Sequence, residues 1–121
     1  MFVRVRHRKS LIRWKDETYC SVYLVSSYRT KRGPRHKQHG YCGTVAFLRG
    51  QPASLWGLHW FWAKAEARLA ALALPPEQEA RLRAALWQRI GPRPAQEELE
   101  ADWQEREAVI KEALTLLGSI R

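Results

Sequence analysis

Cysteine is scarce in this sequence, with Cys20 and Cys42 the only two. Small secreted domains that depend on disulfides need several bridges, so that class of protein is excluded. The opening residues MFVRVRHRK contain no apolar signal core, and we therefore expect a reducing, cytoplasmic location. Long apolar runs are also missing, because three charged residues interrupt the most apolar stretch, 55–74. We expect no transmembrane segment and no membrane partner.

Acidic residues are nearly absent from the first half of the chain. Residues 1–50 contain 12 Lys and Arg against 2 Asp and Glu, whereas residues 51–121 contain 9 against 10. The excess behind the net charge of +9 therefore lies entirely in the first half. Ordinary solubilising surfaces mix both signs of charge, so this distribution favours a polyanionic partner. We predict a basic nucleic-acid-contact module at 1–50 and a near-neutral, Trp-rich helical scaffold or interaction module at 51–121.

The first half has the residue patterns of β-strands. In residues 2–8, Arg side chains alternate with apolar or His side chains. A repeat of two residues is typical of a half-buried strand. Residues 18–28 are rich in aromatic and β-branched side chains, as strands are. Turn residues follow at 30–34 and a return strand at 35–47. We predict a three-stranded antiparallel sheet over about 2–47.

Two details of these strands carry further expectations. Gly40 and Gly43 lie inside the return strand, where glycine marks a bulge, a bend or the close approach of another backbone. In the middle strand, Tyr19 and Tyr23 share one face, and the other face carries Tyr28 with Cys20, Val22 and Leu24. One of the two faces is expected to form the core.

The second half has helical patterns separated by proline. We predict helices over 52–74, 76–90 and 96–117, with Ser54 as the N-cap of the first. One side of this first helix carries apolar side chains at helical intervals, namely Trp56, Trp60, Ala63 and Ala67. The fold class is therefore α+β: an N-terminal three-stranded antiparallel sheet followed by a C-terminal helical hairpin or three-helix unit over about 54–117.

Short motifs in residues 1–47 resemble the N-terminal module of certain bacterial insertion-sequence DDE transposases. The matching segments are Met1 to Val5 (MFVRV) and Tyr23 to Arg29 (YLVSSYR), followed by Gly33, Arg35, Lys37, Tyr41 and Gly43. The chain departs from that pattern in a longer insert at 10–18. The family's catalytic carboxylates lie on an RNase-H-like core far longer than this chain allows. The resemblance therefore implies a nucleic-acid-binding module of bacterial or mobile-element origin without transposase chemistry.

Basic side chains on the first strand and on the following hairpin form the main candidate site. Arginines two apart on a strand point to one face about 6.6 Å apart, so a row of them is able to follow a phosphate backbone. A two-stranded ribbon is also narrow enough to enter the major groove of DNA. The alternative is a solvated sheet face whose charges protect the edge strands. The candidate nucleic-acid-binding residues are Arg4, Arg6, Arg8, Lys9, Arg13, Arg29, Lys31, Arg32, Arg35 and Lys37.

Tyrosines are interleaved with these charges. If they share the exposed face, Tyr23 and Tyr41 are candidates for stacking on unpaired bases, as in single-strand or RNA recognition. The alternative for each ring is packing in the core.

Histidine and cysteine raise the question of a metal site. Zinc accepts two His and two Cys, but the spacing of His36, His39 and Cys42 differs from the paired ligand modules of zinc proteins. We predict no metal and no cofactor, and the weak candidates for metal ligands are Cys20, His36, His39 and Cys42. No carboxylate is identifiable beside these histidines as a partner for general acid–base chemistry, so we expect a non-enzymatic protein.

Tryptophan is abundant in the helical half, and adjacent aromatic residues point in at least two directions. Trp60, Phe61 and Trp62 are therefore candidates for a partner interface, with core packing as the alternative.

The expected function is that of a small nucleic-acid-binding protein with DNA or RNA as its partner. The first alternative is an accessory or inhibitory subunit that docks on a larger nucleoprotein complex through the Trp-rich helices, or forms a homo-oligomer. The second alternative is a small His/Cys metal-dependent nuclease.

Overall fold

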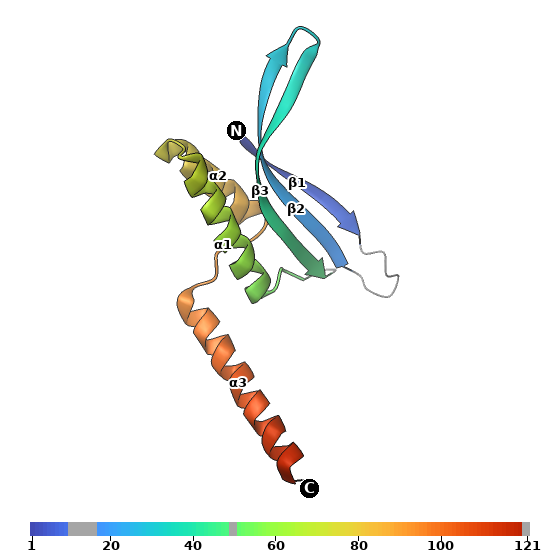
Figure 1. The fold of residues 1–121 in the computed structure, drawn as a ribbon, viewed down its shortest axis with the longest axis vertical. Helices are drawn as coiled ribbons and strands as arrows, with labels where there is room; N and C mark the ends of the chain where they lie inside the picture. The colour runs from blue at the N-terminus through green and yellow to red at the C-terminus, as the bar shows by residue number, and fades with distance from the viewer. Residues whose placement is uncertain (10–16, 49–50, 120–121) are drawn as a thin grey trace.

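The computed structural model describes residues 1–9, 17–48 and 51–119, and in these ranges it has the predicted α+β arrangement (Figure 1). Three antiparallel strands form a sheet of order β1-β2-β3: β1 (Phe2–Lys9), β2 (Glu17–Thr30) and β3 (Gly33–Leu48). Three helices follow: α1 (Leu55–Leu72), α2 (Pro76–Arg89) and α3 (Gln96–Ser119). The N-terminal sheet and the following helices are thus confirmed, and each element lies close to its predicted range.

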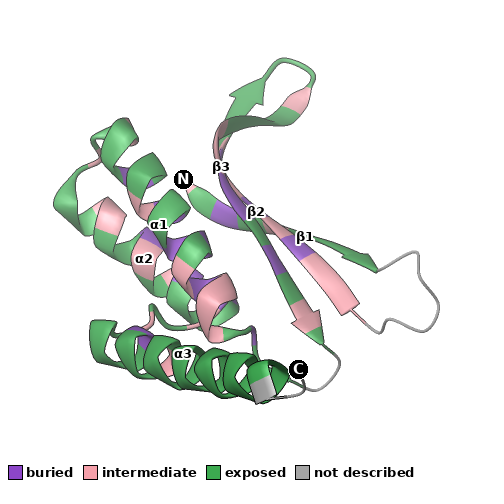
Figure 2. Ribbon diagram, turned by 60° about the horizontal axis from the view of Figure 1, so that its bottom comes forward, coloured by how far each residue is buried: buried purple, intermediate pink, exposed green. Residues whose placement is uncertain are grey.

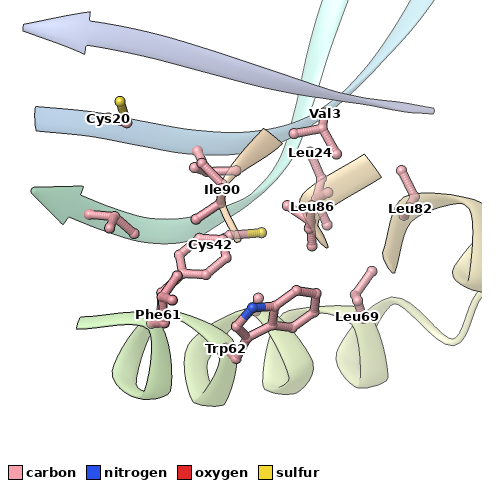
Figure 3. Packing of buried hydrophobic residues seen from close by; sticks show 14 of the residues in the cluster. Val3, Cys20, Leu24, Cys42, Phe61, Trp62, Leu69, Leu82, Leu86 and Ile90 are labelled. Atoms are coloured by element: carbon pink, nitrogen blue, oxygen red, sulfur yellow. The ribbon is translucent and has the colours of Figure 1, made fainter. Parts of the chain in front are cut away.

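One face of the sheet packs against α1 and α2, and this layer contains the core (Figure 3). The middle strand supplies Cys20, Val22 and Leu24, which are at most 6% exposed. The helices supply Phe61, Trp62, Leu69, Leu82 and Leu86 to the same cluster. Helix α1 lies against β3 and α2 against β1, so the two helices cover this face from both edges. The predicted basic region and the predicted helical region therefore share one hydrophobic core.

The buried face of α1 is not the side with Trp56, Trp60, Ala63 and Ala67. Trp60 is 66% exposed, Ala63 and Ala67 are exposed, and Trp56 is half-buried. Residues at the spacings i, i+3, i+4, i+7 and i+11 form the buried stripe instead: Leu58, Phe61, Trp62, Ala65 and Leu69. Two apolar stripes fit the period of this helix, and the stripe with Phe61, Trp62 and Leu69 is the one that joins the core. The predicted N-cap is confirmed, because the Ser54 side chain accepts a hydrogen bond from the Gly57 amide at 3.1 Å.

The two glycines in β3 lie at irregularities, as predicted. The register between β2 and β3 shifts at two places, after Val22 and after Leu24, where β3 contains one extra residue each time. Gly43 and Gly40 adjoin these extra residues, and Gly43 has a φ of +117° that favours glycine. Beyond the bulges, β2 and β3 continue as a two-stranded arm past the ends of the helices (Figure 1).

Polar contacts also attach the helices to one another and to the sheet, among them an ion pair between Arg83 of α2 and Glu66 of α1. The buried indole of Trp62 donates from Nε1 to the carbonyl of Gly91 at 3.0 Å, which satisfies its polar atom at the end of α2. Arg89 of α2 donates from Nη1 to the carbonyl of Val3 at 2.9 Å. The bond from Arg89 covers part of the open backbone of the edge strand β1.

Helix α3 leaves the body of the molecule and does not complete a packed three-helix unit (Figures 1 and 2). Leu99 is its buried residue within the described part of the chain. Trp56 of α1 holds its first turns: the indole donates to Asp102, and its ring meets that of Trp103 at 6.3 Å. From Trp103 to Gly118 every α3 side chain is exposed. The helical hairpin of the prediction therefore consists of α1 and α2.

None of the helices in the described ranges has both the length and the apolar character needed to span a membrane.

Candidate nucleic-acid interface

The face of the sheet opposite the helices, here called the open face, gathers the arginines of β1 and the tyrosines of β2. In the register, Arg4 pairs with Tyr23, Arg6 with Ser21 and Arg8 with Tyr19. Directly paired residues share a face, and their neighbours Val3, Leu24 and Val22 point into the core. Core packing on one face thus forces the arginine row to the other. The three arginines are exposed, and the tyrosines beside them are half-buried.

Guanidinium groups lie over tyrosine rings along this face. The Arg8 guanidinium is 5.7 Å from the centroid of the Tyr19 ring, and that of Arg6 is 5.5 Å from Tyr23. The Tyr23 ring in turn lies 5.3 Å from the ring of Tyr41 on β3. Both distances from cation to ring are within the range of cation–π attraction. These contacts hold the long arginine side chains against the sheet while their charges stay in solvent.

A lysine from the helical layer joins the open face. Lys64 of α1 places its Nζ 4.5 Å from the centroid of the Tyr41 ring, and its methylene stem passes over Gly43 at the edge of β3. A side chain at position 43 would narrow this path, since a Cβ there would lie 3.6 Å from the Lys64 stem. Sequence patterns do not reveal Lys64, because it lies in a helix remote from the arginine row along the chain.

The arm formed by the ends of β2 and β3 is basic on both faces. It carries Arg29, Lys31, Arg32, Arg35 and Lys37, and its sequence from Ser26 to Gln38 contains no acidic residue. The register pairs Arg29 with Pro34 on one face and Arg35 with Tyr28 on the other. All residues from Ser27 to Gln38 are exposed except Gly33 (Figure 2). The two phosphate backbones of DNA border each groove, so a ribbon with cations on both faces has the charge distribution to contact both backbones from within a groove.

A hollow of about 170 Å³ lies on the open face where the arm leaves the body. Its lining comes from all three strands: Arg4, Arg6, Tyr23, Val25, His36 and Gln38. Val25 is 3% exposed, although it alternates with the core-facing Leu24 and belongs to the open face. The hollow therefore has an apolar floor within a surface that is otherwise polar and charged.

The remaining candidates from the sequence fall at different places. Lys9 ends β1 as an exposed side chain, paired with Thr18. Arg13 lies outside the described residues. The structure thus brings Arg4, Arg6 and Arg8 together on the sheet, leaves Lys9 at the end of β1, and groups the other five described candidates on the arm.

The four residues weighed as metal ligands are dispersed. Cys42 is buried in the core, and Cys20 contacts His7 Nδ1 through its sulfur at 3.3 Å. His39 contacts the Ser26 hydroxyl, and His36 lines the hollow on the open face. Across the described ranges, three or more His, Cys, Asp or Glu side chains do not come together in a group suited to a metal ion.

Burial changes the chemistry of the two thiols, which are both free of disulfides. Burial raises the pKa of Cys42 to about 11, although the nearby Arg68 and Lys64 partly oppose the shift. Burial also raises the pKa of Cys20. Both cysteines are therefore neutral thiols near pH 7, and neither has the lowered pKa of a reactive nucleophile.

Of the three candidate residues for a partner interface, two pack in the core, which is the alternative given for them. Phe61 and Trp62 are 3% and 2% exposed, because they lie on the stripe of α1 that faces the sheet and α2. Neither ring is accessible to a partner. Trp60 points away from this stripe and is the one of the three that stays exposed.

Comparison of the chain with protein-family models, with curated proteins and with solved structures finds no match. The resemblance of residues 1–47 to a transposase module stays a prediction.

Proposed function

We propose that the protein binds nucleic acid through the open face and the arm, without catalysing a reaction. The observation that supports the proposal most is the segregation of charge on the sheet. Arg4, Arg6 and Arg8 lie in one row opposite the core, in contact with tyrosine rings, and the row leads to an arm with five more cations. Phosphates supply the affinity of such a surface, and aromatic rings add contacts to bases.

The contrast with the helices supports the same assignment. Helix α3 carries seven acidic and two basic residues from Gln96 to Ser119 and would repel a polyanion. A nucleic acid is therefore expected to lie along the sheet side of the molecule.

The test is the fluorescence anisotropy of labelled duplex DNA, single-stranded DNA and structured RNA at a series of salt concentrations. Neutralising about six phosphates gives a slope of log K against log salt near −5. The variant Arg4→Ala/Arg6→Ala/Arg32→Ala/Arg35→Ala is expected to lose binding and to keep its circular dichroism spectrum. Its matched control removes helical cations by Arg81→Ala/Arg106→Ala/Lys111→Ala and is expected to retain binding. Full affinity in the sheet variant would contradict the proposal.

A second candidate function has support from α3. Its exposed half carries an apolar stripe of Ile110, Leu114 and Leu117, each 58–63% exposed, within a helix of net negative charge. Such a surface complements an apolar and basic surface on a protein, as expected for an accessory subunit of a nucleoprotein complex. The triple variant Ile110→Ser/Leu114→Ser/Leu117→Ser is expected to bind nucleic acid normally. It would lose the pull-down of a protein partner if this second candidate is correct.

A further inference from the structure

The hollow on the open face has the chemistry of a site for one nucleobase. Val25 forms an apolar floor, and the rings of Tyr23 and His36 stand among the lining side chains. Gln38 contributes an amide that both donates and accepts hydrogen bonds, as the edge of a base does. Proteins that bind an unstacked base commonly stack it against aromatic side chains and form hydrogen bonds with its edge.

Neighbouring contacts hold the two rings in place before any ligand arrives. His36 meets the ring of Phe2 edge to face, with the centroids 5.8 Å apart. Tyr23 contacts the Arg6 guanidinium, 5.5 Å from its ring centroid, and the ring of Tyr41, 5.3 Å away. Fixed walls lower the entropic cost of binding, since fewer side chains have to be ordered when the ligand enters.

The size of the hollow restricts its occupant. At about 170 Å³ it is smaller than the pockets of roughly 300–1,000 Å³ that take drug-sized ligands. It has room for one small planar ring. Bases stacked in an intact duplex do not reach such a hollow, whereas an unpaired base swings out into it at low cost.

Cations beside the hollow would take the phosphates of the same nucleotide. Arg4 and Arg6 form part of its lining, and the arm with its cations on both faces begins directly above it. We propose that the hollow binds a single unpaired nucleobase while the arm contacts the adjacent duplex. The preferred ligand is then a duplex interrupted by one unpaired nucleotide, in DNA or in RNA. This inference rests on the proposed nucleic-acid-binding function.

The test compares three labelled ligands of one sequence: an intact duplex, the duplex with a one-nucleotide bulge, and the duplex with an abasic bulge. The abasic ligand has the same backbone length and the same phosphate charge as the bulge and lacks the base. We expect the bulge to bind about tenfold more tightly than the abasic ligand, the gain expected from stacking one base. Parallel DNA and RNA sets show which sugar the site accepts.

Variants of the hollow connect this preference to named residues. Gln38→Leu keeps the size of the side chain and removes the amide, and His36→Ala removes one wall. Each is expected to bring the ratio of bulge to abasic affinity below about twofold. Any change in the contacts with the duplex affects both ligands equally and cancels in this ratio. Lys37 lies between them on β3 with its side chain on the opposite face, so Lys37→Ala is the matched control. It should weaken all three ligands alike and keep the ratio.

The outcomes separate this inference from the function on which it rests. Equal binding of the bulge and the abasic ligand, with the duplex still bound, would overturn the nucleobase site alone. A preference for the bulge that survives both Gln38→Leu and His36→Ala would also overturn it. Failure of every ligand to bind would overturn the proposed function as well.

Discussion

At the scale of single residues, Gly91 is the most constrained backbone position between the helices. Its φ is +148°, and a Cβ built there would lie 3.0 Å from a methyl group of the buried Leu58. Its carbonyl also accepts the Trp62 indole bond. Both the backbone conformation and the space therefore require glycine.

We predict that Gly91→Ala lowers the free energy of unfolding by about 1–3 kcal/mol, the cost of a strained backbone plus a displaced core side chain. Urea denaturation measures the change. Gly118→Ala is the control, because nothing lies within 4 Å of a Cβ at that position. An equal loss in both variants would contradict the assigned strain.

The buried thiol of Cys42 predicts a specific loss of stability in alkali. Its pKa is about 11 in the folded chain against the ordinary value of 9.0. The unfolded chain therefore releases this proton first, so the stabilisation is complete below pH 9 and is lost as the pH rises from 9 to 11. Linkage gives a decline of about 1.4 kcal/mol per pH unit in that window.

Urea denaturation of the wild type and of Cys42→Ala at pH 8, 9, 10 and 11 tests this linkage. The difference in unfolding free energy between the two proteins should shrink steadily above pH 9. Other titrating groups are common to both proteins and cancel in the difference. A constant difference from pH 8 to 11 would show that the Cys42 thiol does not titrate in this manner.

At the scale of elements, the arm and the outer part of α3 stand apart from the core. Among the described residues, neither element supplies a member of the hydrophobic cluster. The members of this cluster come from the sheet below the arm, from Ala53 and α1, and from α2 with the following Ile90. The stability of the molecule should therefore depend little on either element.

We predict that truncation after Gln104 changes the free energy of unfolding by less than about 0.5 kcal/mol. The removed side chains are exposed, and changes at exposed positions usually alter this free energy by no more than about 0.5 kcal/mol. Thermal and urea unfolding of the truncated chain measure this change. The truncated chain retains Leu99 and the contacts of Trp56 with Asp102 and Trp103. A loss of several kcal/mol would mean that the outer half of α3 packs on the body.

Periodicity predicts these elements well because it reports burial on one face of each. The alternation of Arg with Val in β1 gives the correct strand and the correct charged face, and Gly40 and Gly43 give the bulges. The same reasoning fails for α1, where two apolar stripes fit a helix and only the packing partner decides between them. Lys64 and the hollow around Val25 also escape prediction, since both arise from contacts between segments far apart in the chain.

At the scale of the whole molecule, the five cations of the arm and the seven acidic residues of α3 lie at opposite ends. The arm stands at one end of the longest axis, and α3 extends to the other, with the core between them (Figure 1). In the proposed complex, the sheet and the arm would contact the nucleic acid, and α3 would extend into solvent. A protein bound to α3 would not compete with nucleic acid for the same surface.

This arrangement gives the protein a large electric dipole moment along its length. In dilute buffer we expect the acidic helix of one copy to attract the basic arm of the next, in head-to-tail contacts that extend into open chains. Added salt screens the attraction over about 8–10 Å near physiological ionic strength. We therefore expect salting-in: solubility that rises as sodium chloride is added from near zero, as measured by light scattering. Exchanging the seven acidic residues of α3 for Gln should abolish that rise, even though it moves the net charge further from zero.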